Sequence, residues 1–195
     1  MNNIPLFKVF MSEEAPIEVG KTLMSGFVGE GPKVKEFESK LRGFIGNKKL
    51  ITLNSATSSL HLSLHLIKKP KGDWPGLKDG DEVLSCPLTC TATNWPILAN
   101  NLNIKWVDVD RSTCNMSLDD LENKLSPKTK VIMLVHWGGN PTDLDRVEKI
   151  KQKCYNLYGF KPMVIEDCAH SFGSKYKGKN LGNTGHNNFV IYSFQ

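Results

Sequence analysis

Cysteine is sparse and unpatterned in this 195-residue chain. The five cysteines are odd in number and widely spaced, and no two of them form a C-x-x-C pair: Cys86, Cys90, Cys114, Cys154 and Cys168. Paired spacings are typical of zinc sites, and an even number of cysteines is typical of small disulfide-stabilised domains. The sequence therefore favours neither class, and its five histidines and five cysteines form no arrangement typical of a nucleophilic enzyme.

Long apolar runs and concentrated charge are also missing. Residues 1–5 (MNNIP) do not begin the basic and then apolar pattern of a signal peptide, and no apolar run approaches membrane-spanning length. The 25 basic and 20 acidic residues give a net charge of +5, and the basic residues are scattered. A nucleic-acid surface usually concentrates them on one face. We therefore expect a cytoplasmic protein without a membrane or nucleic-acid partner.

Short apolar segments alternate with helical patterns along the chain. Strands are expected at 50–53, 82–85, 104–109, 131–136, 163–166 and 189–194, and helices at 34–44, 57–67, 93–99, 118–125 and 144–157. Several strands are apolar nearly throughout, as in a sheet that is covered on both faces. The alternation predicts an α/β fold with a mainly parallel sheet. Residues 189–195 are expected to form a core strand with no element after it, which indicates a piece of a longer chain.

Three candidate binding segments fall where predicted strands end, which is where ligands gather in open α/β sheets. Residues 54–59 (NSATSS) are small and precede a helix, so they could hold a phosphate or could only cap that helix. In residues 164–170, Asp167 could pair with a protonated ring nitrogen, or it could cap the next element beside a buried His170. Ser193 could donate to a phosphate or could be a turn residue.

Two other patterns are weaker. Residues 26–31 (GFVGEG) resemble a dinucleotide-binding loop, but no strand precedes them and the glycine spacing differs. His61 and His65 lie one helical turn apart, yet no third metal ligand is evident. We therefore expect the two histidines to pack against the protein, and no metal site.

Taken together, eight segments in this order resemble the DegT/DnrJ/EryC1/StrS family of aminotransferases, which depend on pyridoxal 5′-phosphate (PLP) and act on nucleotide sugars. The segments are 26–32 (GFVGEGP), 54–61 (NSATSSLH), 80–83 (GDEV), 87–94 (PLTCTATN), 107–110 (VDVD), 136–141 (HWGGNP), 165–170 (IEDCAH) and 192–194 (YSF). Each segment alone is only modestly specific. Eight of them in the same order are hard to obtain in an unrelated protein. The resemblance covers residues 26–195.

The resemblance implies the large domain of a fold type I PLP-dependent transferase, with helices on both faces of the sheet. Residues 1–32 would be an N-terminal segment, and 33–195 would be a partial PLP-binding domain. The backbone at Thr57 and Ser58, with Ser193, would hold the PLP phosphate. Asp167 would pair with the pyridine nitrogen, and His170 would lie near the phenolic oxygen of the cofactor.

The chain departs from the family pattern in two places. Where relatives usually carry an aromatic residue that stacks on the cofactor ring, this chain has Cys90, which offers a smaller contact. The Schiff-base lysine is expected a few residues beyond the position of Ser193, and the sequence ends at Gln195. Lys175, Lys177 and Lys179 belong to a predicted loop and do not match that position. We therefore expect no catalytic residue in this chain and no aminotransferase activity from it alone.

The resemblance also implies the substrates. The complete enzyme would take an amino group from glutamate, pass it to a keto group of a nucleotide-linked sugar, and act as a homodimer in amino-sugar and polysaccharide biosynthesis, including lipopolysaccharide. Three alternatives remain open: a dehydratase of the same family with histidine in place of the lysine, a non-catalytic degenerate copy, and a broken gene without function.

Overall fold

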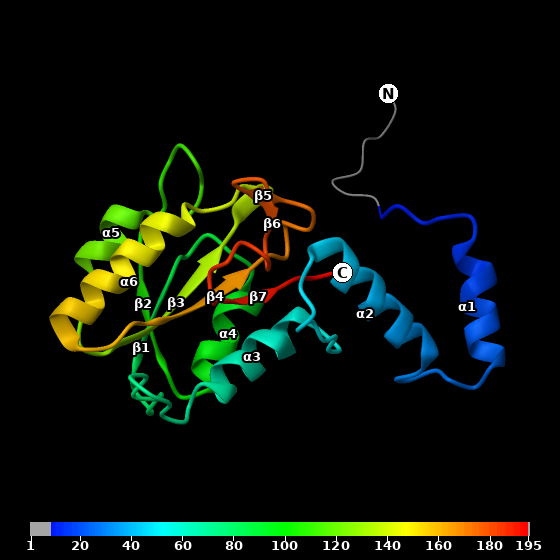
Figure 1. The fold of residues 1–195 in the computed structure, drawn as a ribbon, viewed down its shortest axis with the longest axis horizontal. Coiled ribbons are helices and arrows are strands. Elements are labelled where there is room, and N and C mark those ends of the chain that lie inside the picture. Colours follow the sequence, from blue (N-terminus) through cyan, green and yellow to red (C-terminus); the bar gives the residue numbers. More distant parts are fainter. Residues whose placement is uncertain (1–8, 195) are drawn as a thin grey trace.

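The central element is a parallel β-sheet. The structure is a computed structural model that describes residues 9–194. The strands lie in the order β2-β1-β3-β4-β7 (Figure 1), with bounds β1 (Glu82–Ser85), β2 (Asn103–Trp106), β3 (Thr129–Val135), β4 (Met163–Asp167) and β7 (Phe189–Ile191). The register aligns Val135 with Asp167 and Asp167 with Ile191. The residues that follow β3, β4 and β7 therefore converge at one edge.

Helices cover both faces of the sheet, as predicted. Helices α5 (Leu118–Asn123) and α6 (Leu144–Tyr158) pack on one face, against a core that includes Leu134 and Val164. Helices α3 (Ala56–Leu66) and α4 (Thr91–Ala99) cover the other face, where Met133 and Ile165 are buried (Figure 1). Since successive strand residues point to opposite faces, Glu166 belongs to the α6 side and Asp167 to the α3 and α4 side.

Local sequence signals explain the helix ends. Helix α2 (Pro32–Ile45) has proline in its first turn, where the missing N–H would be unpaired anyway. It stops at Gly46, whose φ of 81° is in the left-handed region. A Cβ there would also lie 2.5 Å from Asn183 Nδ2. Helix α6 begins where the Asp143 side chain accepts a hydrogen bond from the Arg146 amide.

The segment between β4 and β7 contains a small antiparallel hairpin, β5 (Lys175–Tyr176) and β6 (Lys179–Asn180). The predicted loop around Lys175, Lys177 and Lys179 therefore contains two short strands. The Tyr176 hydroxyl donates to Asp143 Oδ1, and Lys177 forms an ion pair with Asp145, so the hairpin is fastened to the start of α6.

The predicted strand at 50–53 is wrong. The segment is irregular, and Ile51 in it is exposed. Among the strands that the structure describes, none runs beside it to complete a hydrogen-bond ladder. Its backbone groups instead bond to α2: Glu38 accepts from the Thr52 amide at 2.8 Å, and Arg42 donates to the Leu50 carbonyl.

Two further differences concern the ends of the described chain. Helix α1 (Ala15–Met24) was not predicted, and it has no buried residue, so no buried apolar stripe marks it. The strand predicted at 189–194 ends at Ile191 and lies at the edge of the described sheet, while Ile191 is buried and Phe189 and Val190 pack against the two core clusters. Within residues 9–194, no helix has the length and apolar character needed to cross a membrane.

Candidate functional site

A cavity of about 1880 Å³ opens at the carboxyl ends of β4 and β7, bounded also by α2, by α3 along its length and by the start of α4. Five of the six predicted site residues line it: Thr57, Cys90, Asp167, His170 and Ser193. Ser58 does not line the cavity, although it follows Thr57 directly. The topology therefore gathers segments that are distant in the sequence around one space, as expected for the carboxyl edge of a parallel sheet.

Asp167 supplies a buried carboxylate to this cavity. Its Oδ2 accepts a hydrogen bond from Thr93 Oγ1 at 2.7 Å, and its Oδ1 accepts from the Ala169 amide at 3.1 Å. Thr93 donates its only hydroxyl hydrogen to Asp167. Thr89 must therefore be the donor in the 2.6 Å contact between the two threonine hydroxyls. Each carboxylate oxygen can accept more than one hydrogen bond, so Asp167 keeps capacity for a ligand.

Thr93 is the residue that sequence reasoning missed. It lies in the first turn of α4, is 1% exposed, and is separated from Asp167 by 74 positions. The segment 87–94 supported the family resemblance, but only its cysteine received a role. The available signal was position: the first turn of the helix that follows β1 lies at the carboxyl edge of the sheet, where β4 also ends, although β3 lies between the two strands.

The N-terminus of α3 offers amide groups at the same cavity. Ser55 caps the helix, since its hydroxyl oxygen accepts from the Ser58 amide at 3.1 Å. The Ser58 amide is therefore already engaged. Within residues 9–194, no acceptor bonds to the amides of Ala56 and Thr57. Helix N-termini of this kind attract anions. The capping and anion-binding interpretations of this segment are thus compatible.

His170 is exposed at the cavity and is not a buried core histidine, so that alternative is wrong. Its Nδ1 accepts from the Gly138 amide at 3.4 Å, which leaves the ring hydrogen on Nε2. The ring also meets Trp137 edge to face, with centroids 5.0 Å apart. These contacts hold His170 against η1 (Trp137–Gly139), the short 3-10 helix after β3.

Cys90 and Ser193 both line the cavity. Cys90 is the exposed N-cap residue of α4, and its side chain makes no capping hydrogen bond. Ser193 is half-buried after β7. Beside it, Phe194 meets Phe37 of α2 edge to face at 5.3 Å and forms part of an apolar wall. Tyr192 also lines the cavity; burial raises the pKa of its hydroxyl, and the hydroxyl donates to the Leu181 carbonyl.

His61 and His65 do not form a site. Both are exposed on α3, so the expectation that they pack against the protein is wrong. In the part of the chain that the structure describes, the group of side chains with metal-ligand geometry is His136, Glu166 and Cys168. This group lies on the other face of the sheet from Asp167.

A family model for DegT/DnrJ/EryC1/StrS aminotransferases matches residues 10–195. The chain belongs to this family. It is 34% identical over 182 residues to the spore coat polysaccharide biosynthesis protein SpsC of Bacillus subtilis, a match that covers 93% of this chain and 43% of SpsC. The family resemblance drawn from eight short segments is therefore confirmed.

Solved structures of family members agree with this assignment. The sugar aminotransferase CalS13 from Micromonospora echinospora matches with a TM-score of 0.87 and 45% identity, covering 97% of this chain and 49% of CalS13. A GDP-4-keto-6-deoxy-D-mannose-3-dehydratase of E. coli with bound hydrated PLP matches with a TM-score of 0.82 and 26% identity, covering 93% of this chain and 45% of that one. The predicted fold type I architecture is confirmed, and the chain spans less than half the length of each of these family members.

Proposed function

We propose that this chain forms the cofactor-binding part of a PLP-dependent enzyme that transfers an amino group from glutamate to a keto group of a nucleotide-linked sugar. The observation that carries the proposal is the position of Asp167: a buried carboxylate with spare acceptor capacity, at a cavity that also receives the N-terminus of α3. A protonated heterocycle and a phosphate on one small molecule match these two features.

The donor set fits PLP. The amides of Ala56 and Thr57 would bind the phosphate oxygens, and the Ser193 hydroxyl would donate to them. Asp167 would accept from the pyridine N–H. Ser58, which was expected to contribute its backbone, would act instead by fixing the Ser55 cap, because its amide is engaged there.

Bound PLP would supply an electron sink for negative charge at the reacting carbon of the substrate. Asp167 would keep the hydrogen on the pyridine nitrogen, and Thr93 would hold the carboxylate in the plane that this contact needs. His170 Nε2–H would donate to the phenolic oxygen, since Nδ1 is taken by Gly138. Cys90 would cover one face of the ring with a small, polarisable side chain.

The cofactor site is tested by Asp167→Asn in the 195-residue chain. Loss of a charge-assisted hydrogen bond should weaken PLP binding about 10- to 100-fold, as measured by titration of the cofactor absorbance. Asp73→Asn is the matched control, because Asp73 is exposed in the connection before β1. Equal PLP affinity in the wild type and Asp167→Asn would contradict the proposal. Because a dehydratase with bound PLP is among the related structures, product analysis of the complete enzyme with a keto-sugar nucleotide and glutamate would separate amination from dehydration.

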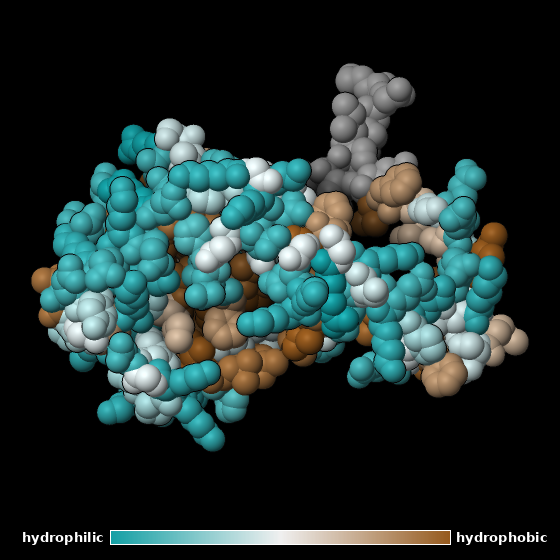
Figure 2. All heavy atoms as spheres, viewed as in Figure 1, coloured by the Kyte–Doolittle hydropathy of each residue, from teal (hydrophilic) through white to brown (hydrophobic). Residues whose placement is uncertain are grey.

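We also propose that the protein assembles as a homodimer through the region of α1. Four apolar residues of this helix are 56% or more exposed: Ile17, Val19, Leu23 and Met24. Figure 2 shows apolar side chains among hydrophilic ones at the surface of this end of the molecule, while the opposite end is mostly hydrophilic. Exposed apolar patches on proteins commonly mark interfaces. In sedimentation velocity, the double variant Ile17→Asp/Leu23→Asp should shift a dimer to monomer, whereas Glu13→Gln should not. A dimer that persists in the double variant would refute this assignment.

A further inference from the structure

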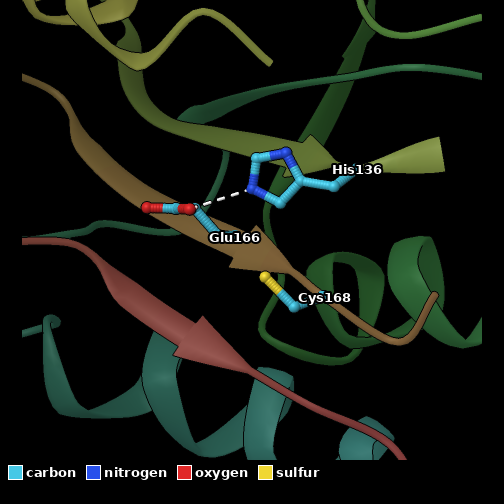
Figure 3. A group of neighbouring side chains, drawn as sticks. All are labelled: His136, Glu166 and Cys168. Carbon is cyan, nitrogen blue, oxygen red and sulfur yellow. Dashed lines mark hydrogen bonds and ion pairs between the residues drawn. The ribbon is translucent and has the colours of Figure 1, made fainter. Parts of the chain in front are cut away.

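Three buried side chains form a cluster directly behind Asp167. His136 follows β3, Glu166 belongs to β4, and Cys168 follows β4. All three are buried, and their polar atoms lie within 4.8 Å of one another. Figure 3 shows the His136 ring directed at the Glu166 carboxylate across the two strands. The strand alternation sends Glu166 and Asp167 to opposite faces, so this cluster is outside the cavity.

The hydrogen bonds of the cluster do not suit a metal ion. His136 Nδ1 accepts from the Thr142 amide at 3.0 Å, so the ring hydrogen must be on Nε2. Nε2 then donates to Glu166 Oε2 at 2.9 Å and has no lone pair for a cation. Burial, together with the charges of Glu166 and Asp167, raises the pKa of the Cys168 thiol well above its usual value. A protonated thiol is a poor metal ligand. The cluster is therefore a hydrogen-bonded pair with a neutral thiol beside it.

Glu166 joins three strands. While Oε2 accepts from His136 after β3, Oε1 accepts from Asn188 Nδ2 at 2.7 Å. Asn188 immediately precedes β7, the strand that leads to Ser193. Both donors point at one carboxylate, so any side chain with only one acceptor oxygen at this position leaves one donor unpaired. Buried groups left unpaired in this way are destabilising.

His136 fastens the turn that carries Asp167 and His170. Its amide donates to the Asp167 carbonyl at 3.2 Å, and its carbonyl accepts from the buried Ser171 hydroxyl at 2.9 Å. Three residues later, Gly139 packs so closely that a Cβ would lie 3.1 Å from the His170 carbonyl oxygen. The backbone on both sides of the Asp167 and His170 side chains is thus set by the position of His136.

We propose that His136 and Glu166 are a positioning pair that sets the orientation of Asp167 and His170 from the opposite face of the sheet. The pair fixes the end of β3 to β4, and through Asn188 it fixes the start of β7, so the carboxyl ends of β3 and β4 and the start of β7, all of which border the cavity, keep one relative placement. Its effect on the cofactor rests on the proposed function, but its effect on the Asp167 turn does not.

The test is a hydrogen-bond swap. Glu166→Gln keeps the shape of the side chain, but its amide group must face either the His136 or the Asn188 donor. The double variant Glu166→Gln/Asn188→Asp re-forms both hydrogen bonds of position 166, because the glutamine amide can donate to the new carboxylate while its oxygen accepts from His136; the second new carboxylate oxygen replaces Asn188 Oδ1, which has no partner among the described residues. Val164→Ala is the matched control, since Val164 is buried on the same face of β4 two residues earlier and its apolar side chain forms no hydrogen bond.

Three quantities are measured on the 195-residue chain: the PLP dissociation constant, the urea midpoint, and the backbone amide NMR shifts of Ala169 and Gly138, which report the Asp167 and His170 hydrogen bonds. Glu166→Gln should weaken PLP binding about tenfold, the equivalent of one lost hydrogen bond, and should move both amide resonances without PLP present. The double variant should restore both. Val164→Ala should lower the urea midpoint while leaving the amide resonances and PLP affinity unchanged.

The outcomes separate the two proposals. If wild-type chain does not bind PLP, the cofactor proposal fails, while the amide resonances still decide the positioning pair. If Glu166→Gln lowers only the urea midpoint, as Val164→Ala does, or if the double variant fails to restore the resonances, the pair is merely structural and the inference is overturned.

Discussion

Replacing Thr93 with valine isolates one hydrogen bond at the candidate site. Valine has nearly the shape of threonine but no hydroxyl, so it removes the 2.7 Å donor to Asp167 Oδ2 and the acceptor for Thr89. Both Thr93 and Asp167 are almost fully buried, at 1% and 6% exposure, so water does not readily replace the lost partner.

The size of the expected loss in stability follows from the kind of hydrogen bond that Thr93→Val removes. A hydrogen bond to a charged group contributes about 1.5–3 kcal/mol to stability. At a urea m-value of about 2 kcal/mol per molar, the midpoint of unfolding should fall by about 1 M. PLP affinity should fall by about tenfold, because the carboxylate is no longer held in one orientation for the pyridine N–H and about 1.4 kcal/mol corresponds to that factor.

Two assays check this prediction: urea unfolding followed by tryptophan fluorescence, and titration of PLP by absorbance. Thr93→Ser retains the hydroxyl and loses only a methyl group, so it should keep most of the PLP affinity. Thr89→Val removes the first donor of the hydrogen-bond series from Thr89 through Thr93 to Asp167. It should lower the urea midpoint and the PLP affinity less than Thr93→Val does. If Thr93→Val matches the wild type in both assays, the hydrogen bond to Asp167 has no role in holding the carboxylate, and the reasoning is refuted.

Two further predictions concern the borders of the cavity. Cys90→Phe should tighten PLP binding about 2- to 10-fold in the same titration, because a stacked aromatic ring contributes about 0.5–1.5 kcal/mol; unchanged or weaker binding would mean that Cys90 does not face the ring. The Thr52 amide and hydroxyl, with Arg42, lower the pKa of Glu38 below its ordinary 4.5. The ionised Glu38 carboxylate therefore contributes its full stabilisation above pH 4.5. This contribution is lost as the pH falls through the lower pKa that Glu38 has in the folded protein. The difference in unfolding free energy between wild type and Glu38→Gln should shrink from neutral pH to about pH 3, and a constant difference would contradict the assignment.

The sequence alone determined the layered α/β architecture. Apolar strands and amphipathic helices are local patterns, and helices α2 to α6 and strands β1, β3 and β4 lie close to their predicted bounds. It also indicated Asp167 and His170, because parallel strands bring their carboxyl ends to one edge and these residues follow such an end. The order of eight short segments was enough to identify the family.

Tertiary structure alone decided which groups meet. Residues 50–53 have the composition of a strand, but a strand exists only with a neighbour, and the described sheet provides none beside them. The Ser58 amide turned out to be engaged by Ser55, which no composition could indicate. The contact of Thr93 with Asp167 spans 74 positions, and that of His136 with Glu166 spans 30. Hydrogen bonds between such distant residues depend on strand order and register, which are set when the whole sheet assembles.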